Sequence, residues 1–119
     1  MILVDTSVWV DHLRSGDSRL AATLEAASVV MHPMVLGELA CGNLKDRQAL
    51  LALWRNLPQL APATDAEALF LLERNRLWGR GIGYIDLHLL ASVSLSPETR
   101  LWTRDRRLRE TAEHLGLAH

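Results

Sequence analysis

The chain has 119 residues, 49% of them hydrophobic and 23% charged, so we expect one globular domain over residues 1–119 with its own apolar core. Its single cysteine, Cys41, excludes an internal disulfide, and no apolar run approaches the roughly 20 residues that span a bilayer. The N-terminus lacks a signal-type apolar segment, which indicates a cytoplasmic protein without a membrane partner. Because the formal net charge is only -1, any nucleic-acid site must come from local charge placement.

The first half of the chain has the pattern of strands alternating with helices. An apolar run over residues 2–5 predicts a buried strand, and Thr6 or Ser7 can cap a helix that follows to about residue 14. The next elements, in order, are a helix over residues 18–27 capped by Asp17, a strand over 28–32, a helix over 33–41 that begins at Pro33, and a helix over 46–56.

The second half continues the alternation. Residues 57–62 form a connection in which a short edge strand is possible, and Thr64 with Glu67 has the capping-box spacing that opens a helix closed by Gly79. The following elements are a glycine loop over residues 79–83, a helix over 84–95, a turn over 96–98, a strand over 100–103 and a helix over 106–115. This alternation predicts an α/β domain with a mainly parallel sheet.

Four carboxylates stand among apolar neighbours in the sequence: Asp5, Glu38, Asp86 and Asp105. An ionised carboxylate is unfavourable in the interior unless its charge is compensated, and one divalent cation can compensate several. In open parallel sheets, functional groups gather at the carboxyl ends of the strands. Asp5 and Asp105 follow predicted strands, while Glu38 and Asp86 lie on predicted helices, so we expect the four to meet at one edge of the sheet.

Each acid also has a simpler interpretation. Asp5 and Asp105 can be ordinary helix N-caps, each contributing about 1 kcal/mol. Glu38 can form a buried ion pair, and Asp86 can stabilise the start of its helix through the helix dipole. The full set favours a shared site, because the remaining acids lie in polar or helix-face contexts that need no special explanation.

The four acids lie in segments that resemble one family in order and spacing. Residues 1–9, Met-Ile-Leu-Val-Asp-Thr-Ser-Val-Trp, are similar to the opening of a PIN-domain ribonuclease of the VapC toxin type. Residues 33–39, 82–91 and 101–105 resemble the three further motifs of that family, each of which carries an acid. The resemblance covers essentially the whole chain, and the ordered set is more specific than any single motif.

The resemblance implies a PIN-like three-layer fold, in which helices flank a central, mainly parallel sheet of four or five strands. It implies that Asp5, Glu38, Asp86 and Asp105 are catalytic and hold Mg²⁺, or alternatively Mn²⁺. The implied activity is that of an endoribonuclease, the toxin component of a toxin–antitoxin module, which hydrolyses RNA and leaves 5′-phosphate and 3′-hydroxyl ends. The implied partners are RNA, a small antitoxin of the VapB type and a second copy in a homodimer.

One departure from the family pattern concerns the number of metal ions. Many relatives have a further Asp two positions after the fourth acid, where this chain has Arg107. We therefore expect one metal ion and leave a second open. A bound ion would neutralise the scissile phosphate and acidify the attacking water. The hydroxyls of Ser7 and Thr103 are candidates for orienting a carboxylate or a water at the site.

RNA also needs positive charge near the acidic cluster. The arginines closest in sequence to the third and fourth acids are Arg80, Arg104, Arg106 and Arg107. Contacts between these side chains and phosphates would give salt-sensitive and largely sequence-independent affinity. The alternative is a solvated helix face on which the arginines of the last helix pair with Glu110 and Glu113.

Two other function classes remain open from the sequence. A non-catalytic PIN-like RNA-binding or scaffold module would not bind Mn²⁺. A phosphotransfer module with Asp5 as the acceptor would need a second acid beside Asp5 and a lysine nearby, but the only lysine is Lys45.

Overall fold

A three-stranded parallel sheet lies at the centre of the computed structural model, which describes all residues 1–119. Its strands are β1 (Ile2–Val4), β2 (Val29–Val30) and β3 (Arg100–Trp102), in the order β2-β1-β3. The helices are α1 (Thr6–Ser15), α2 (Ser18–Glu25), α3 (Pro33–Ala40), α4 (Arg47–Asn56), α5 (Asp65–Arg74), α6 (Tyr84–Ser94) and α7 (Arg106–His114). The predicted α/β class with a parallel sheet is therefore confirmed.

The sheet has fewer strands than the expected four or five. Met31, directly after β2, forms a single parallel bridge with Gln59. Leu101, within β3, forms a single parallel bridge with Ala118. Pro58 and Pro62 have no backbone N–H to donate, so the segment around Gln59 cannot extend its bridge into a full strand. The two bridges mark the edges of the sheet without adding strands to it.

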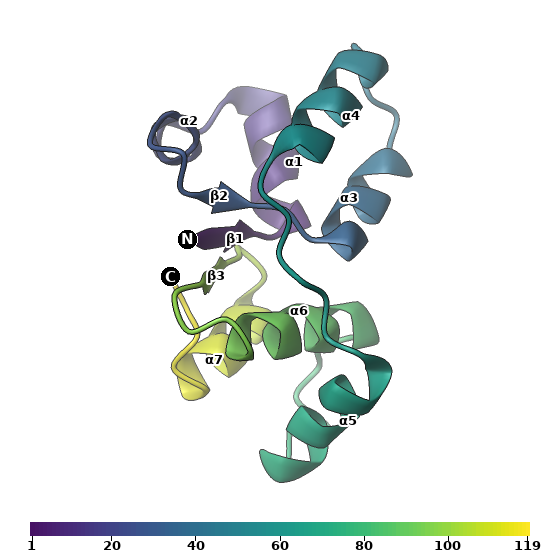
Figure 1. Cartoon of the computed structure of the whole chain (residues 1–119), viewed down its shortest axis with the longest axis vertical. Helices are drawn as coiled ribbons and strands as arrows, with labels where there is room; N and C mark the ends of the chain where they lie inside the picture. Colours follow the sequence, from purple (N-terminus) through teal and green to yellow (C-terminus); the bar gives the residue numbers. More distant parts are fainter.

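Helices lie on both sides of the strands (Figure 1). The helices α1 to α4 group at the β2 end of the molecule, and α5 to α7 group at the β3 end. The N–H of Asp5 donates to the carbonyl of Trp102 at 2.9 Å, which holds the ends of β1 and β3 together. The carboxyl ends of the parallel strands β1 and β3 therefore lie at the same edge of the sheet. None of the helices combines the length and apolar character needed to cross a bilayer.

Large apolar side chains from the sheet and from both helix groups form the core. Trp9 of α1 and Trp54 of α4 are buried and meet edge to face, with ring centroids 5.8 Å apart. Burial of each such side chain contributes about 2–3 kcal/mol. The helix α6 is buried at every position from Leu87 to Val93, so it is fixed between the sheet and α5. This immobilises the segment that carries Asp86.

Local sequence signals explain most helix starts. The side chain of Asp17 accepts from the N–H of Leu20 and caps α2, and Thr64 forms a capping box with Glu67 at the start of α5. The expected cap of α1 by Thr6 or Ser7 is wrong. Asp5 holds the N-cap position without a capping hydrogen bond, and the Ser7 hydroxyl donates to Asp5 instead.

The end of α5 differs from the expectation that Gly79 closes it. The helix ends at Arg74, and Arg76 adopts a left-handed conformation with φ of 53°. The chain then turns so that the N–H of Leu77 donates to the carbonyl of Leu72 at 3.0 Å. Leu77 is buried against α6 neighbours such as Leu87 and Ala91, and this packing overrides the helical pattern.

Candidate metal and active site

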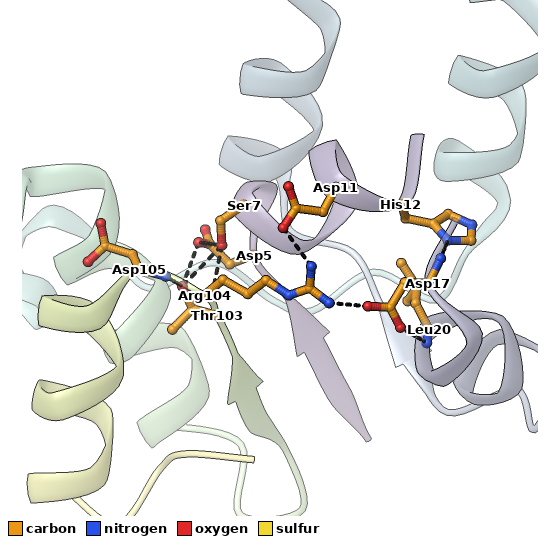
Figure 2. A network of polar contacts seen from close by, with 9 residues as sticks. All are labelled: Asp5, Ser7, Asp11, His12, Asp17, Leu20, Thr103, Arg104 and Asp105. Carbon is orange, nitrogen blue, oxygen red and sulfur yellow. Dashed lines mark hydrogen bonds and ion pairs between the residues drawn. The ribbon is translucent and has the colours of Figure 1, made fainter. Parts of the chain in front are cut away.

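Asp5 is the most enclosed acid of the candidate site, with 6% of its surface exposed. It follows β1 directly, and its Oδ2 accepts hydrogen bonds of 2.8 Å from both Ser7 Oγ and Thr103 Oγ1. Figure 2 shows the three side chains together at the sheet edge. The two hydroxyls satisfy the Oδ2 atom of this buried carboxylate and fix its orientation.

The two hydroxyls are themselves held by the backbone after β3. Ser7 Oγ accepts from the N–H of Arg104 at 3.0 Å, and Thr103 Oγ1 accepts from the N–H of Asp105 at 3.1 Å. Each hydroxyl therefore accepts from the backbone and donates to Asp5. The segment from Thr103 to Asp105 thus places the first and fourth acids relative to each other.

The N-cap interpretation applies to one of the two strand-end acids. Asp105 caps α7, because its Oδ1 accepts from the N–H of Leu108 at 2.9 Å. Asp5 has no such bond to its helix, so capping does not explain its position. The second oxygen of Asp105 is left available to a ligand.

Glu38 is oriented by a residue that was not among the expected site residues. It lies on α3 and is exposed, and its Oε1 accepts from Thr6 Oγ1 at 2.8 Å. The sequence pattern predicts only a helix-capping role for Thr6. Its position directly after Asp5, at the start of a helix, is the one signal that would have indicated this role.

Asp86 lies in the first turn of α6 and is half-buried. Burial raises the pKa of Asp86 above its usual value, and the N–H of Gly83, 3.2 Å from Oδ2, opposes this shift. The negative charges of Asp5, Asp105 and Glu38 also raise the pKa of Asp86. The charges of the other three acids therefore reach Asp86.

The degree of burial differs from the sequence-based expectation. Only Asp5 is buried, Asp86 is half-buried, and Glu38 and Asp105 are exposed. The apolar neighbours of Glu38 along the chain, such as Val35 and Leu39, point into the core from the other face of α3. The partial burial of Asp86, together with the negative charges that act on it, is thus the feature that favours a cation.

The chemistry of these donors fits a divalent metal ion. Carboxylate oxygens are the preferred ligands of Mg²⁺ and Mn²⁺, and a cation would relieve the repulsion that acts on Asp86. The side chains are not gathered for binding, however, because no three His, Cys, Asp or Glu side chains stand close enough together to hold one ion. Metal binding would therefore need some of these side chains to change conformation.

The candidate RNA-binding arginines have different surroundings. Arg104 forms ion pairs with Asp11 and Asp17, and Figure 2 shows it extending toward them, away from Asp105. Arg106 pairs with Glu110 one turn along α7. Arg80 and Arg107 are exposed and form no ion pair.

The fold is that of a known class. The PIN domain family matches residues 2–114, and the chain belongs to that family. Two relatives are named Ribonuclease VapC32, from Mycobacterium tuberculosis strains CDC 1551 / Oshkosh and ATCC 25618 / H37Rv. Each is 49% identical over 118 residues, which cover 99% of this chain and 95% of the relative. The resemblance stated from the four motifs is confirmed.

Proposed function

We propose that this protein is a metal-dependent endoribonuclease and the toxin of a toxin–antitoxin module, with Asp5, Glu38, Asp86 and Asp105 as its catalytic acids. The observation that carries the proposal is the buried Asp5, fixed by two hydroxyls, whose charge acts on Asp86 together with the charges of Glu38 and Asp105. The 49% identity to proteins named ribonucleases supports the assignment.

The residues of the site have distinct tasks in this proposal. Asp5 is the fixed ligand, because its environment is closed and its Oδ2 is held by Ser7 and Thr103. Glu38, held by Thr6, and Asp105, fixed through one oxygen at the start of α7, are exposed and can approach a ligand from outside. When bound, a divalent ion supplies charge neutralisation at the scissile phosphate and acidification of the attacking water.

The proposed cofactor is Mg²⁺, with Mn²⁺ as a substitute, at a single site. Both ions take oxygen ligands and retain waters, which suits four carboxylates that are only partly enclosed. Arg107 occupies the position where many relatives have a further Asp, so the chain offers no fifth carboxylate there for a second ion.

The proposed protein partner is a small antitoxin of the VapB type. A groove of about 500 Å³ runs along α1 and α3 to the start of α4, and its lining includes Thr6 and Glu38. Val10, Leu13 and Leu50 add apolar surface to it. An apolar antitoxin segment seated in this groove would cover Glu38 and block the acidic site.

We further propose that residues 1–119 form one PIN domain, which acts in the cytoplasm as a homodimer.

The proposal is tested by incubating the purified, antitoxin-free protein with cellular RNA, with Mg²⁺ or Mn²⁺ and with excess EDTA. We expect cleavage only with the metal, and sequencing of 5′-phosphate ends would then identify the substrate. Metal-independent cleavage would contradict the proposed chemistry. Absence of both cleavage and Mn²⁺ binding would instead favour the non-catalytic scaffold, an alternative that the separation of the acids keeps open.

A further inference from the structure

Arg107 differs from the other arginines around the start of α7. Arg104 is paired with Asp11 and Asp17, while Arg106 and Arg109 pair with glutamates one turn further along the helix. Arg107 is exposed and makes neither an ion pair nor a side-chain hydrogen bond. Among these four arginines, Arg107 is therefore the one without an acidic partner.

The side chain of Arg107 packs against Gly81. A Cβ atom added to Gly81 would stand 2.5 Å from Cδ and 2.6 Å from Nη1 of Arg107, closer than real Cβ contacts. Gly81 also has a φ of 78°, a backbone angle that residues other than glycine rarely adopt. The bare backbone of Gly81 thus provides a seat for the outer part of the Arg107 side chain, from Cδ to the guanidinium.

This contact joins the two segments that carry the third and fourth acids. Arg107 lies two residues after Asp105, in the first turn of α7. Gly81 lies two residues before Gly83, whose N–H donates to Asp86. The guanidinium of Arg107 consequently stands at the rim of the acidic site, between the segments of Asp86 and Asp105.

We propose that Arg107, seated on Gly81, binds a phosphate of the RNA backbone beside the scissile one and so positions the substrate over the acids. This inference rests on the proposed ribonuclease function. The acidic site by itself repels RNA, so a fixed positive charge at its rim is needed to bring the backbone close. A guanidinium suits this task because its planar donors match phosphate oxygens in pairs.

The first test compares Arg107→Ala with Arg109→Ala, which removes the same charge from the same helix but from a paired residue. Binding of a labelled single-stranded RNA is measured in EDTA over a range of salt concentrations, and kcat and KM are measured with Mg²⁺. We expect Arg107→Ala to bind RNA about tenfold more weakly and to raise KM with little change in kcat. The slope of log affinity against log salt should fall by about 0.7, the value for one lost contact to a single strand. Arg109→Ala should match the wild type, and Arg107→Lys should recover part of the affinity.

The second test uses a pair of glycines with the same backbone geometry. Gly79 has a φ of 75°, yet a Cβ there would meet nothing within 4 Å. Gly79→Ala therefore introduces similar backbone strain without displacing Arg107. We expect Gly81→Ala to weaken RNA binding as Arg107→Ala does, with no further loss in the double variant, and Gly79→Ala to bind RNA normally.

The outcomes separate this inference from the proposed function. If the wild type cleaves RNA but Arg107→Ala equals Arg109→Ala in affinity, salt slope and KM, the role of Arg107 is overturned and the ribonuclease function stands. If the wild type neither cleaves RNA nor binds Mn²⁺, both are overturned. Equal RNA affinities for Gly81→Ala and Gly79→Ala would overturn the role of Gly81 as a seat.

Discussion

Thr103 Oγ1 donates a 2.8 Å hydrogen bond to Asp5 Oδ2 and joins the ends of β3 and β1 across 98 positions of sequence. The same oxygen accepts the N–H of Asp105, so one hydroxyl touches the segments of two proposed catalytic acids. The organisation of the site therefore depends on a buried polar contact that no local pattern in the sequence encodes.

We expect Thr103→Val to damage both stability and activity. Valine has a similar shape but leaves Asp5 with one donor fewer and the N–H of Asp105 without its acceptor. Loss of buried hydrogen-bond partners lowers the free energy of unfolding by about 1–3 kcal/mol. Urea denaturation measures this change, and RNA cleavage measures the activity. Thr99→Val is the matched control, because Thr99 is also buried and bonds to Ser96 at the opposite end of β3. Equal activity of the two variants would contradict the role of Thr103.

We expect Thr6→Val to lower activity while changing stability little. Thr6 orients the exposed Glu38, so its loss should change the free energy of unfolding by no more than about 0.5 kcal/mol. If Glu38 acts in catalysis, kcat should fall several-fold as this carboxylate loses its preferred orientation. Thr23→Val is a suitable control, since the Thr23 hydroxyl bonds only to the carbonyl of Arg19 within α2. Unchanged kcat in Thr6→Val would argue that the orientation of Glu38 does not matter.

The starts of helices were the features best predicted from the sequence, because their signals are local. Asp17, Pro33 and Thr64 each mark a helix start in the expected way. The end of α5 could not be predicted, because it depends on the burial of Leu77 against a helix that comes later in the chain. The local sequence favours a helix through Gly79, but the packing of Leu77 ends the helix earlier, at Arg74.

The four acids of the candidate site remain a prediction as a set, and the burial that singled them out is confirmed only for Asp5. The apolar neighbours of Glu38 suggested burial, whereas the helix places Val35 and Leu39 inside and Glu38 outside. The pairing of Arg104 with Asp11 and Asp17 also could not be foreseen, because it needs α1, α2 and the end of β3 to be placed in space.

Stability should fall in acid partly because of His32. This side chain is fully buried, its Nδ1 accepts from the N–H of Met34, and its Nε2 lies 2.9 Å from Ser92 Oγ. Burial, with a smaller effect from His88, lowers the pKa of His32 from 6.5 to about 4. Between pH 6.5 and 4, His32 binds a proton in the unfolded chain but stays neutral in the folded chain. Stability from this group is therefore complete above pH 6.5 and is lost as the pH falls toward 4, by about 3 kcal/mol in total.

Denaturation at several pH values tests this assignment. His32→Asn retains a side-chain acceptor for the N–H of Met34 but does not titrate, so its stability should depend less on pH between 4 and 6.5. The variant will be less stable at neutral pH because asparagine is smaller. The slope, rather than the absolute stability, is the decisive quantity. An identical slope in the wild type and the variant would contradict the prediction.

Arg104→Ala should weaken the fold without weakening RNA binding. Its guanidinium ties Asp11 of α1 to Asp17, the cap of α2, and both pairs are lost in the variant. Thermal unfolding should occur at lower temperature, and the difference from the wild type should shrink at high salt, which screens exposed ion pairs. RNA affinity that falls as far as in Arg107→Ala would show instead that Arg104 leaves its partners to contact the substrate.

The most direct measurement of the proposed site is RNA cleavage by Asp5→Asn beside the wild type, with Mg²⁺ and with excess EDTA. Asparagine retains the shape and one acceptor oxygen of Asp5 but removes its charge, so circular dichroism should show an intact fold. We expect the cleavage rate to fall by about a hundredfold or more and Mn²⁺ binding to be lost. Cleavage by Asp5→Asn at the wild-type rate, or wild-type cleavage undiminished in EDTA, would contradict a metal site built on Asp5.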